Sequence, residues 1–143
     1  MKKIMFLAVI IVCMSATYYF AIFLPKMRDF EMRDMCAKKA EESFKKNYPR
    51  TQGETYGYTC HYNKRLNKCF IEVSGALFDI SEQTSNVDSL FDAYENKTYA
   101  EYHQVVKKGQ HYYDTPPFIC TMLGKTCNSK AEYDSFVKPY MEE

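Results

Sequence analysis

Cysteine is the residue type with the most chemical potential in this sequence. Of six cysteines, one lies in an apolar N-terminal run and the others follow it: Cys36, Cys60, Cys69, Cys120 and Cys127. This density predicts disulfide bonds in an oxidising compartment, and metal binding or catalysis in the cytosol. The cysteine spacings are longer than the two to four residues of compact zinc modules. The pattern therefore favours disulfides over a structural metal.

Two disulfides are expected. Cys120 and Cys127 are close in sequence and flank a glycine turn, so they are expected to pair. Cys69 has two candidate partners, Cys60 across a predicted hairpin and Cys36 on the inward face of a predicted helix. Closing the longer loop would stabilise by about 3.8 kcal/mol and the shorter by about 2.7 kcal/mol. Because directly opposed cysteines in a hairpin are often strained, Cys36–Cys69 is preferred and Cys60 is left buried or reactive.

Other reactive side chains give weaker signals. The neighbours Cys60 and His61 lie on a predicted strand, where successive side chains point to opposite faces. Residues 124–126 (Gly-Lys-Thr) resemble the end of a phosphate-binding loop, but Ile119 stands where that loop needs a glycine. No catalytic residue, cofactor site or metal ligand is therefore assigned.

An uncharged apolar run covers residues 4–24, between Lys2-Lys3 and Pro25. As an α-helix it would be about 31 Å long, close to the hydrocarbon thickness of a bilayer. A cleaved signal needs small residues before the cut, but Met14 and Tyr19 occupy those positions at the nearest candidate sites. Residues 1–24 are predicted to be a transmembrane signal-anchor, with secretion after cleavage as the alternative.

The cysteines decide the expected side of the membrane. Basic residues flank the apolar run on both sides, but long domains cross largely regardless of charge. Disulfides require an oxidising compartment, so residues 25–143 are expected in the periplasm or outside the cell, held by a single pass through the inner membrane. The chain has a net charge of only +1 and no basic stripe, which excludes nucleic acid as a partner.

One helix and two hairpins are expected to build the domain. Apolar residues recur every four positions over residues 26–48, which predicts an amphipathic helix that continues the membrane helix. Alternation over residues 55–74 predicts a hairpin turning at Lys64-Arg65, with Cys60 opposite Cys69. A second hairpin is predicted over residues 90–105.

The second hairpin has its turn at Asn96-Lys97, because asparagine tolerates the backbone of a tight turn. This register places Phe91 opposite Tyr102, and Leu90 on the other face. Residues 76–86 are expected to connect the two hairpins. A Ser129/Glu132 capping box predicts a short C-terminal helix. The fold class is therefore α+β, with the amphipathic helix packed on an antiparallel sheet of about four strands.

Tyrosine-rich strands form a candidate binding face, because tyrosine is favoured at interfaces. The residues expected to share it are Tyr56, Tyr58, Tyr62, Tyr94 and Tyr99.

Several short stretches resemble small exported or membrane-anchored bacterial proteins with no assigned function. They are CAKKAEESF (36–44), HYNKRLNKCF (61–70), LFDAYENKTYAEY (90–102), PPFIC (116–120) and VKPYMEE (137–143). The resemblance implies a bacterial origin and export, and implies no activity. Cys60 lies outside the pattern of those proteins, which agrees with an unpaired Cys60.

The functional hypothesis is a membrane-anchored, extracytoplasmic, non-enzymatic binding or assembly module that meets a protein partner. One alternative is a pilin-like subunit, which also has an apolar N-terminal helix, a sheet and a C-terminal cysteine loop. The glycine before the apolar run and the glutamate early in it, both typical of pilins, are absent. The other alternative is a small periplasmic thiol protein or enzyme that uses Cys60.

Overall fold

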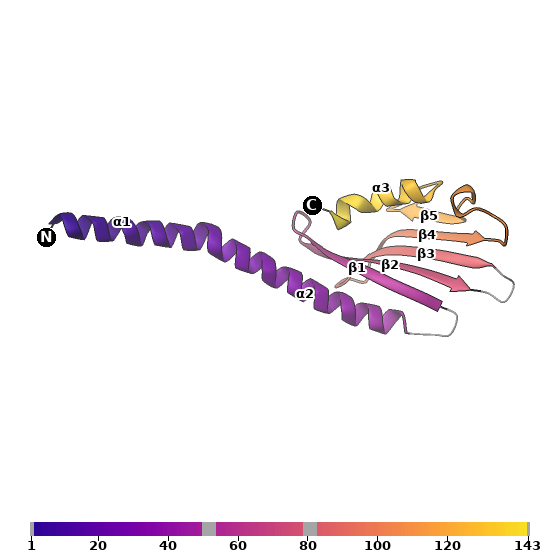
Figure 1. Ribbon diagram of the computed structural model, residues 1–143, viewed down its shortest axis with the longest axis horizontal. Coiled ribbons are helices and arrows are strands. Elements are labelled where there is room, and N and C mark those ends of the chain that lie inside the picture. Colours follow the sequence, from indigo (N-terminus) through magenta and orange to yellow (C-terminus); the bar gives the residue numbers. More distant parts are fainter. Residues whose placement is uncertain (1, 50–53, 79–82, 143) are drawn as a thin grey trace. The chain divides into compact units, whose positions relative to one another are not determined.

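The computed structural model describes residues 2–49, 54–78 and 83–142 (Figure 1). The chain divides into two compact units, Met1–Asp34 and Met35–Glu143. The first is helical and the second is α+β. The predicted membrane boundary after residue 24 stays a prediction.

The first unit is one run of helix. It contains α1 (Lys2–Tyr18), the π-helix η1 (Tyr19–Phe23) and the beginning of α2 (Leu24–Asn47). The widened turn is closed by the Leu24 amide, which donates to the Tyr19 carbonyl. Pro25 follows directly and has no N–H to donate, so an irregular turn beside it is expected. A continuous helix from the apolar run into the amphipathic segment was predicted, and the structure confirms it.

Among the described residues, the helix Val9–Asn47 is long and apolar enough to cross a membrane. The serine and the threonine of its apolar part are satisfied within the helix. Ser15 Oγ donates to the Ile11 carbonyl at 2.8 Å, and Thr17 Oγ1 donates to the Cys13 carbonyl at 2.7 Å. The segment therefore presents an apolar surface although its sequence contains polar residues.

The second unit is built on an antiparallel sheet of six strands in chain order (Figure 1). A helix packed on an antiparallel sheet, with a C-terminal helix, was predicted and is confirmed; two short strands, β5 and β6, add to the expected four. The elements after α2 are β1 (Glu54–Asn63), β2 (Lys68–Phe78), β3 (Thr84–Asp92), β4 (Thr98–Val106), η2 (Tyr112–Asp114), β5 (Ile119–Met122), β6 (Lys125–Thr126) and α3 (Lys130–Met141).

The predicted register of the first hairpin was wrong by two residues. Cys60 pairs with Ile71, and Tyr62 pairs with Cys69. The turn has four residues, because Asn63 Oδ1 accepts the Leu66 amide at 3.0 Å and Asn67 takes a positive φ of 51°. An even shift keeps each side chain on its expected face, so the assignment of inward and outward residues survives.

The predicted register of the second hairpin was wrong by an odd number of residues. Leu90 pairs with Ala100, and the register shifts between Leu90 and Phe91. Tyr102 therefore shares a face with Leu90 rather than with Phe91. The predicted connection over residues 76–86 was also wrong, since β2 runs to Phe78 and β3 begins at Thr84.

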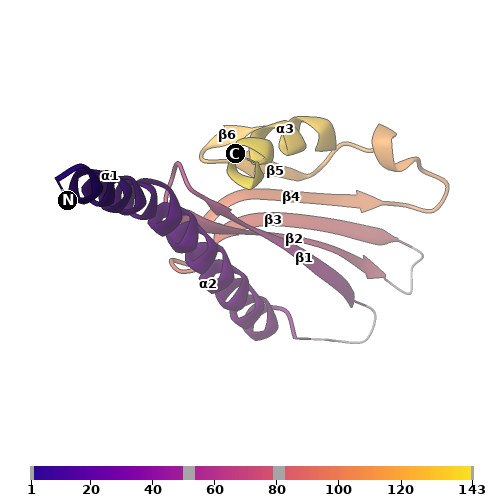
Figure 2. The same cartoon turned by 60° about the vertical axis from the view of Figure 1, so that its left-hand side comes forward.

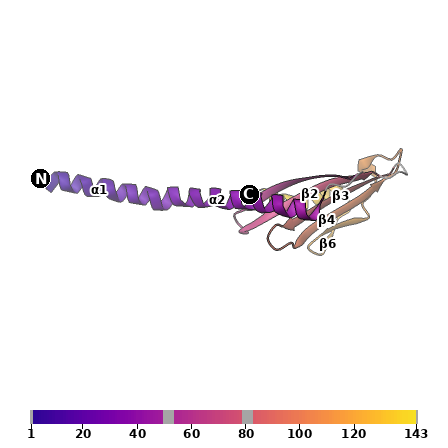
Figure 3. The same cartoon turned by 90° about the horizontal axis from the view of Figure 1, so that it is seen from below.

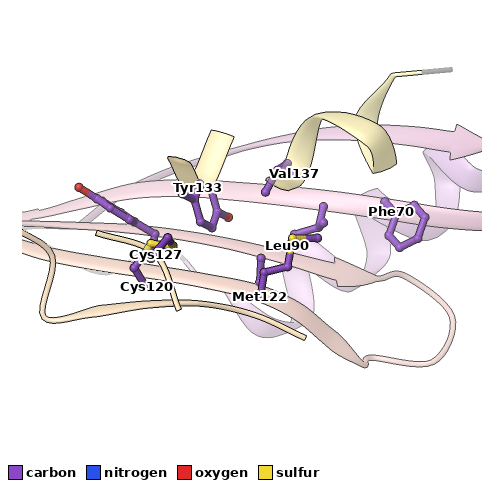
Figure 4. Close-up of a cluster of buried hydrophobic side chains, with 9 residues drawn as sticks. Phe70, Leu90, Cys120, Met122, Cys127, Tyr133 and Val137 are labelled. Atoms are coloured by element: carbon purple, nitrogen blue, oxygen red, sulfur yellow. A yellow bond between two sulfur atoms is a disulfide. The ribbon is translucent and has the colours of Figure 1, made fainter. Parts of the chain in front are cut away.

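The two helices of the second unit pack on opposite faces of the sheet. Residues 35–47 of α2 bury Cys36, Ala40 and Ser43 and are joined to β2 through Cys69. Figure 2 shows the strands in order with α3 beside β5, and the twist of the sheet is visible in Figure 3. The main core lies under α3 (Figure 4) and contains Phe70, Leu90, Ala100, Tyr102, Cys120, Met122, Cys127, Tyr133 and Val137.

Candidate functional site

Two disulfides lie in the second unit. Cys36 bonds to Cys69, with Cα atoms 5.4 Å apart, and Cys120 bonds to Cys127, with Cα atoms 5.0 Å apart. These are the pairings preferred from the sequence. All four residues are buried, so both bonds are part of the packed interior.

Cys60 is a free and partly buried thiol. It lies on β1 opposite Ile71, on the face covered by α2. Burial raises the pKa of the Cys60 thiol above its ordinary value, which lowers the fraction of reactive thiolate. The neighbouring His61 points to the other face of the sheet, as strand alternation requires.

Three of the predicted binding-face tyrosines lie on the face of β1 that α2 covers. The Tyr58 ring packs on Phe44 of α2 with centroids 4.5 Å apart, and the Tyr56 ring packs on Tyr48 at 5.1 Å. Tyr62 is almost fully buried. These rings attach the helix to the sheet, so they leave little surface for a partner.

The other two tyrosines lie elsewhere. Tyr99 packs edge-on against Phe70 and contacts Tyr140 of α3, with centroids 5.2 and 5.7 Å away. Tyr94 is exposed in the turn between β3 and β4. The structure therefore does not bring the five tyrosines onto one face.

A polar cluster surrounds Lys130, the first residue of α3. Its Nζ lies 3.3 Å from Asp88 Oδ2 and 2.6 Å from Asp134 Oδ1, and 4.7 Å from the centre of the Tyr133 ring. Burial alone would lower the pKa of Lys130, but the hydrogen bond to Asp134 and the charge of Asp88 raise it overall. Lys130 is therefore a fixed positive charge, held between two carboxylates.

Buried hydroxyl and amide groups complete this cluster. Burial, together with the nearby Tyr112 and Asp88, raises the pKa of Tyr102 to about 12. Gln104 is almost fully buried; its Nε2 donates to the Tyr112 carbonyl at 2.8 Å and also to the Thr115 carbonyl. Its Oε1 has no hydrogen-bond partner among the described residues. Gln104 thus fixes the loop that follows β4 against the sheet.

Two adjoining cavities open beside Lys130, and both are lined by Lys130 and Tyr112. One, of about 430 Å³, lies between β4, the η2 loop and the start of α3. The other, of about 320 Å³, is lined mainly by β1, β2 and β3 and includes Asp88. Because Lys130 and Tyr102 both hold their protons well above neutral pH, this cleft suits recognition by charge and hydrogen bonds rather than proton transfer.

A third cavity, of about 670 Å³, lies between the β1–β2 turn and the end of α3. It is lined by Asn63, Lys64, Arg65, Lys138, Pro139 and Glu142. Asn63 is buried, and its Nδ2 donates to the Pro139 carbonyl at 3.1 Å, which joins the turn to the helix. The cavity walls carry three cations and one carboxylate.

Sequence reasoning did not find the Lys130 cluster, because Asp88 and Lys130 are far apart in the chain and meet only through the register of β3 and the position of α3.

Within residues 2–49, 54–78 and 83–142, no three His, Cys, Asp or Glu side chains group as metal ligands do. Comparisons with protein-family models, curated proteins and solved structures give no match.

Proposed function

We propose that this protein is a membrane-anchored extracytoplasmic binding or assembly module. Residues 4–24 would lie in the bilayer, and residues 25–143 would face the periplasm or the exterior. One combination carries the proposal: an apolar helix whose described side chains are all exposed, in the same chain as two disulfides. Uncovered apolar surface of this length needs lipid, and stable disulfides need an oxidising compartment.

Binding fits the geometry of the second unit better than catalysis does. The cleft beside Lys130 offers a fixed cation, two carboxylates and tyrosine hydroxyls on a rigid sheet. Such groups recognise a partner by charge and hydrogen bonds. The free thiol of Cys60 has a raised pKa, which does not favour a nucleophile.

Membrane fractionation followed by non-reducing peptide mass mapping tests this function. We expect the full chain in the alkali-resistant membrane fraction, with Cys36–Cys69 and Cys120–Cys127 linked. A C-terminal reporter that is active only outside the cytoplasm should be active. A soluble, fully reduced cytosolic protein would contradict the proposal. The mass of the mature N-terminus separates a retained anchor from a cleaved signal.

Thiol labelling tests the alternative that uses Cys60. The folded protein is expected to react with a maleimide at Cys60 much more slowly than the unfolded protein does, because burial raises the pKa of the thiol. Labelling faster than that of a model thiol would instead favour a thiol protein.

A pilin-like subunit is the second candidate. The feature that favours it is a helix with an apolar first part that packs its second part on an antiparallel sheet, followed by the Cys120–Cys127 loop. Assembly separates the two candidates. Shearing cells that express the protein should release filaments from a pilin-like subunit, and should release none from a binding module that stays in the membrane.

A further inference from the structure

The sheet face that packs against α3 continues past the beginning of the helix as two rows of mostly short side chains. Strand pairing across β1 to β4 builds the first row from Gly57, Ser74, Asp88 and Tyr102. The second row lies two residues away on each strand and ends at Gln104 on β4. Both rows line the two cavities beside Lys130. A Cβ at Gly57 would meet nothing within 4 Å, so the short side chains leave space over the sheet.

The two cavities carry an excess of negative charge. Among the described residues that line them, Lys130 is the one cation, whereas Asp88 lines the smaller cavity and Asp114 the larger. Lys130 is already paired twice, with Asp88 at 3.3 Å and with Asp134 at 2.6 Å. An anionic ligand would therefore meet a neutralised lysine among carboxylates, so the charge of the cleft favours a cation.

Glu72 adds a further carboxylate to this region. It is half-buried and lies two residues before Ser74 on β2, so both side chains share one face of the sheet. Burial raises the pKa of Glu72, and the charges of Asp88 and Asp134 raise it too, although Lys130 opposes them. The negative charge around Glu72 therefore exceeds what Lys130 neutralises.

The larger cavity also has a buried hydrogen-bond acceptor in its wall. Gln104 lines this cavity and is only 1 % exposed. Its Nε2 donates to the Tyr112 and Thr115 carbonyls, so its Oε1 points away from that loop. No described residue donates to Oε1. A buried acceptor left unpaired costs about 1–3 kcal/mol, so this atom favours a ligand that brings an N–H donor.

The rings around Lys130 show how the cleft holds an ammonium group. Lys130 Nζ lies 4.7 Å from the centre of the Tyr133 ring and 5.7 Å from that of Tyr102. Aromatic faces attract ammonium groups at such distances. The surroundings suit a second ammonium better than a metal ion, because the described part of the chain groups no three His, Cys, Asp or Glu side chains as ligands.

We infer that the cleft beside Lys130 binds an alkylammonium group, with Asp88 and Asp114 supplying the negative charge and Gln104 Oε1 accepting an N–H. The cavities, of about 430 and 320 Å³, have the size of small-ligand sites. Two sources offer this chemistry, a free aliphatic amine and the lysine side chain of a partner. The inference rests on the proposed function, because it names the ligand class of the binding module.

Calorimetric titration of the full-length protein in nonionic detergent tests the inference. We expect diaminopentane to bind saturably, with a dissociation constant of about 0.1–1 mM. Pentanediol has the same chain length without charge and should show no saturable binding. Binding that is equal for pentanediol, or absent for the amine, would overturn the inference.

A lysine whose backbone amine and carboxyl are blocked identifies the source of the ammonium, since it presents only its side-chain amine. Affinity equal to that of diaminopentane would support the inference with a lysine of a partner as the ligand. Weaker binding would support it with a free diamine as the ligand.

Variants locate the site. Asp88→Asn together with Asp114→Asn removes two charges at nearly unchanged shape and should weaken diaminopentane binding about tenfold. The matched control is Glu41→Gln with Glu101→Gln, because both glutamates are exposed on the side of the sheet that α2 covers. Gly57→Leu leaves every charge in place, places a side chain in the smaller cavity and should also weaken binding. Unchanged affinity in the double aspartate variant and in Gly57→Leu would overturn the location.

Failure of the ligand class and failure of the proposed function give different results. A protein that is recovered in the membrane fraction but binds neither amine would overturn the ligand class alone. A soluble, fully reduced cytosolic protein would overturn the proposed function whatever it binds, because titration in detergent does not depend on the compartment.

Discussion

The disulfide between Cys36 and Cys69 joins the helix on one face of the sheet to a strand inside it. The two Cα atoms lie 5.4 Å apart, and both residues are about as buried as the hydrophobic core. Cys69 is the second residue of β2, which pairs with β1 on one side and β3 on the other. The bond therefore fixes α2 to the sheet at a point where both neighbouring strands are already held.

Removing this bond should destabilise the second unit more than removing the shorter one. Chain-entropy estimates give about 3.8 kcal/mol for the Cys36–Cys69 loop and about 2.5 kcal/mol for the Cys120–Cys127 loop. Denaturant unfolding of Cys36→Ala/Cys69→Ala and Cys120→Ala/Cys127→Ala in detergent measures both losses of unfolding free energy. Equal losses would show that loop length does not set the contribution.

Asp92, the last residue of β3, is expected to be the most sensitive polar position beside the β3–β4 turn. Its buried carboxylate accepts Lys68 Nζ and the Tyr94 amide, each at 2.8 Å, and the Glu95 amide at 3.1 Å. Burial alone would raise the pKa of Asp92, but these hydrogen bonds outweigh it and lower the pKa. Stability from this group is present above the unfolded pKa and is lost as pH falls through the lower folded pKa.

Asp92→Ala should therefore lower the unfolding free energy by about 2–3 kcal/mol at neutral pH, because it leaves buried donors unpaired. Asp92→Asn retains an acceptor for the backbone amides and should lose less. Denaturation at pH 7 compares the two variants. An asparagine variant as unstable as the alanine variant would assign the whole effect to the charge.

Two glycines in the first hairpin should respond differently to alanine. A Cβ at Gly75 would collide with the Tyr56 ring, which lies over this glycine from the paired position on β1. Gly75→Ala should cost about 1–3 kcal/mol of unfolding free energy, because the ring must leave its packing on Tyr48. Gly57→Ala is the matched control, since a Cβ there meets nothing within 4 Å. Similar losses at both positions would rule out the collision as the cause.

Glu72 should make the unfolding free energy of the second unit depend measurably on pH. Burial, with the charges of Asp88 and Asp134, raises the pKa of Glu72, although Lys130 opposes this. A group with a raised folded pKa contributes stability below its unfolded pKa, and that contribution is lost as pH rises through the folded value.

The difference in unfolding free energy between Glu72→Gln and the unchanged protein should therefore move in favour of glutamine as pH rises from about 4 to 7. Denaturant titrations at several pH values measure it. A difference that does not change with pH would show that the glutamate is equally solvated in both states.

Local periodicity was sufficient to predict most of the fold. The four-residue repeat over residues 26–48 predicted α2, and the alternation in β1 and β2 predicted which side chains share a face. Ser129 caps α3 as expected, with its Oγ accepting the Glu132 amide at 3.2 Å. These features depend on residues close together in the chain.

Features that depend on distant contacts were not predictable in the same way. The register of the second hairpin differs from the predicted one by an odd number of residues, because the register shifts at Leu90 and the Asp92 carboxylate accepts a backbone amide of the turn. The alternation of apolar and polar residues reveals neither feature. Alternation also cannot say which face a helix will cover, so tyrosines that pack under α2 were expected at an interface. The Lys130 cleft was not predictable, because its lining comes from β3, β4, the η2 loop and α3, which meet only in the folded chain.

The position of the Cys36–Cys69 bond has a mechanical consequence. A pulling force applied through the chain before residue 36 passes across the sulfur bridge directly into β2. The intervening residues 37–68, including the second part of α2 and all of β1, then lie outside the load path. Tension applied through the chain before residue 36 would be resisted by the disulfide bond and by β2, which is paired on both sides. The second unit should therefore stay folded under a force that would peel away an edge strand.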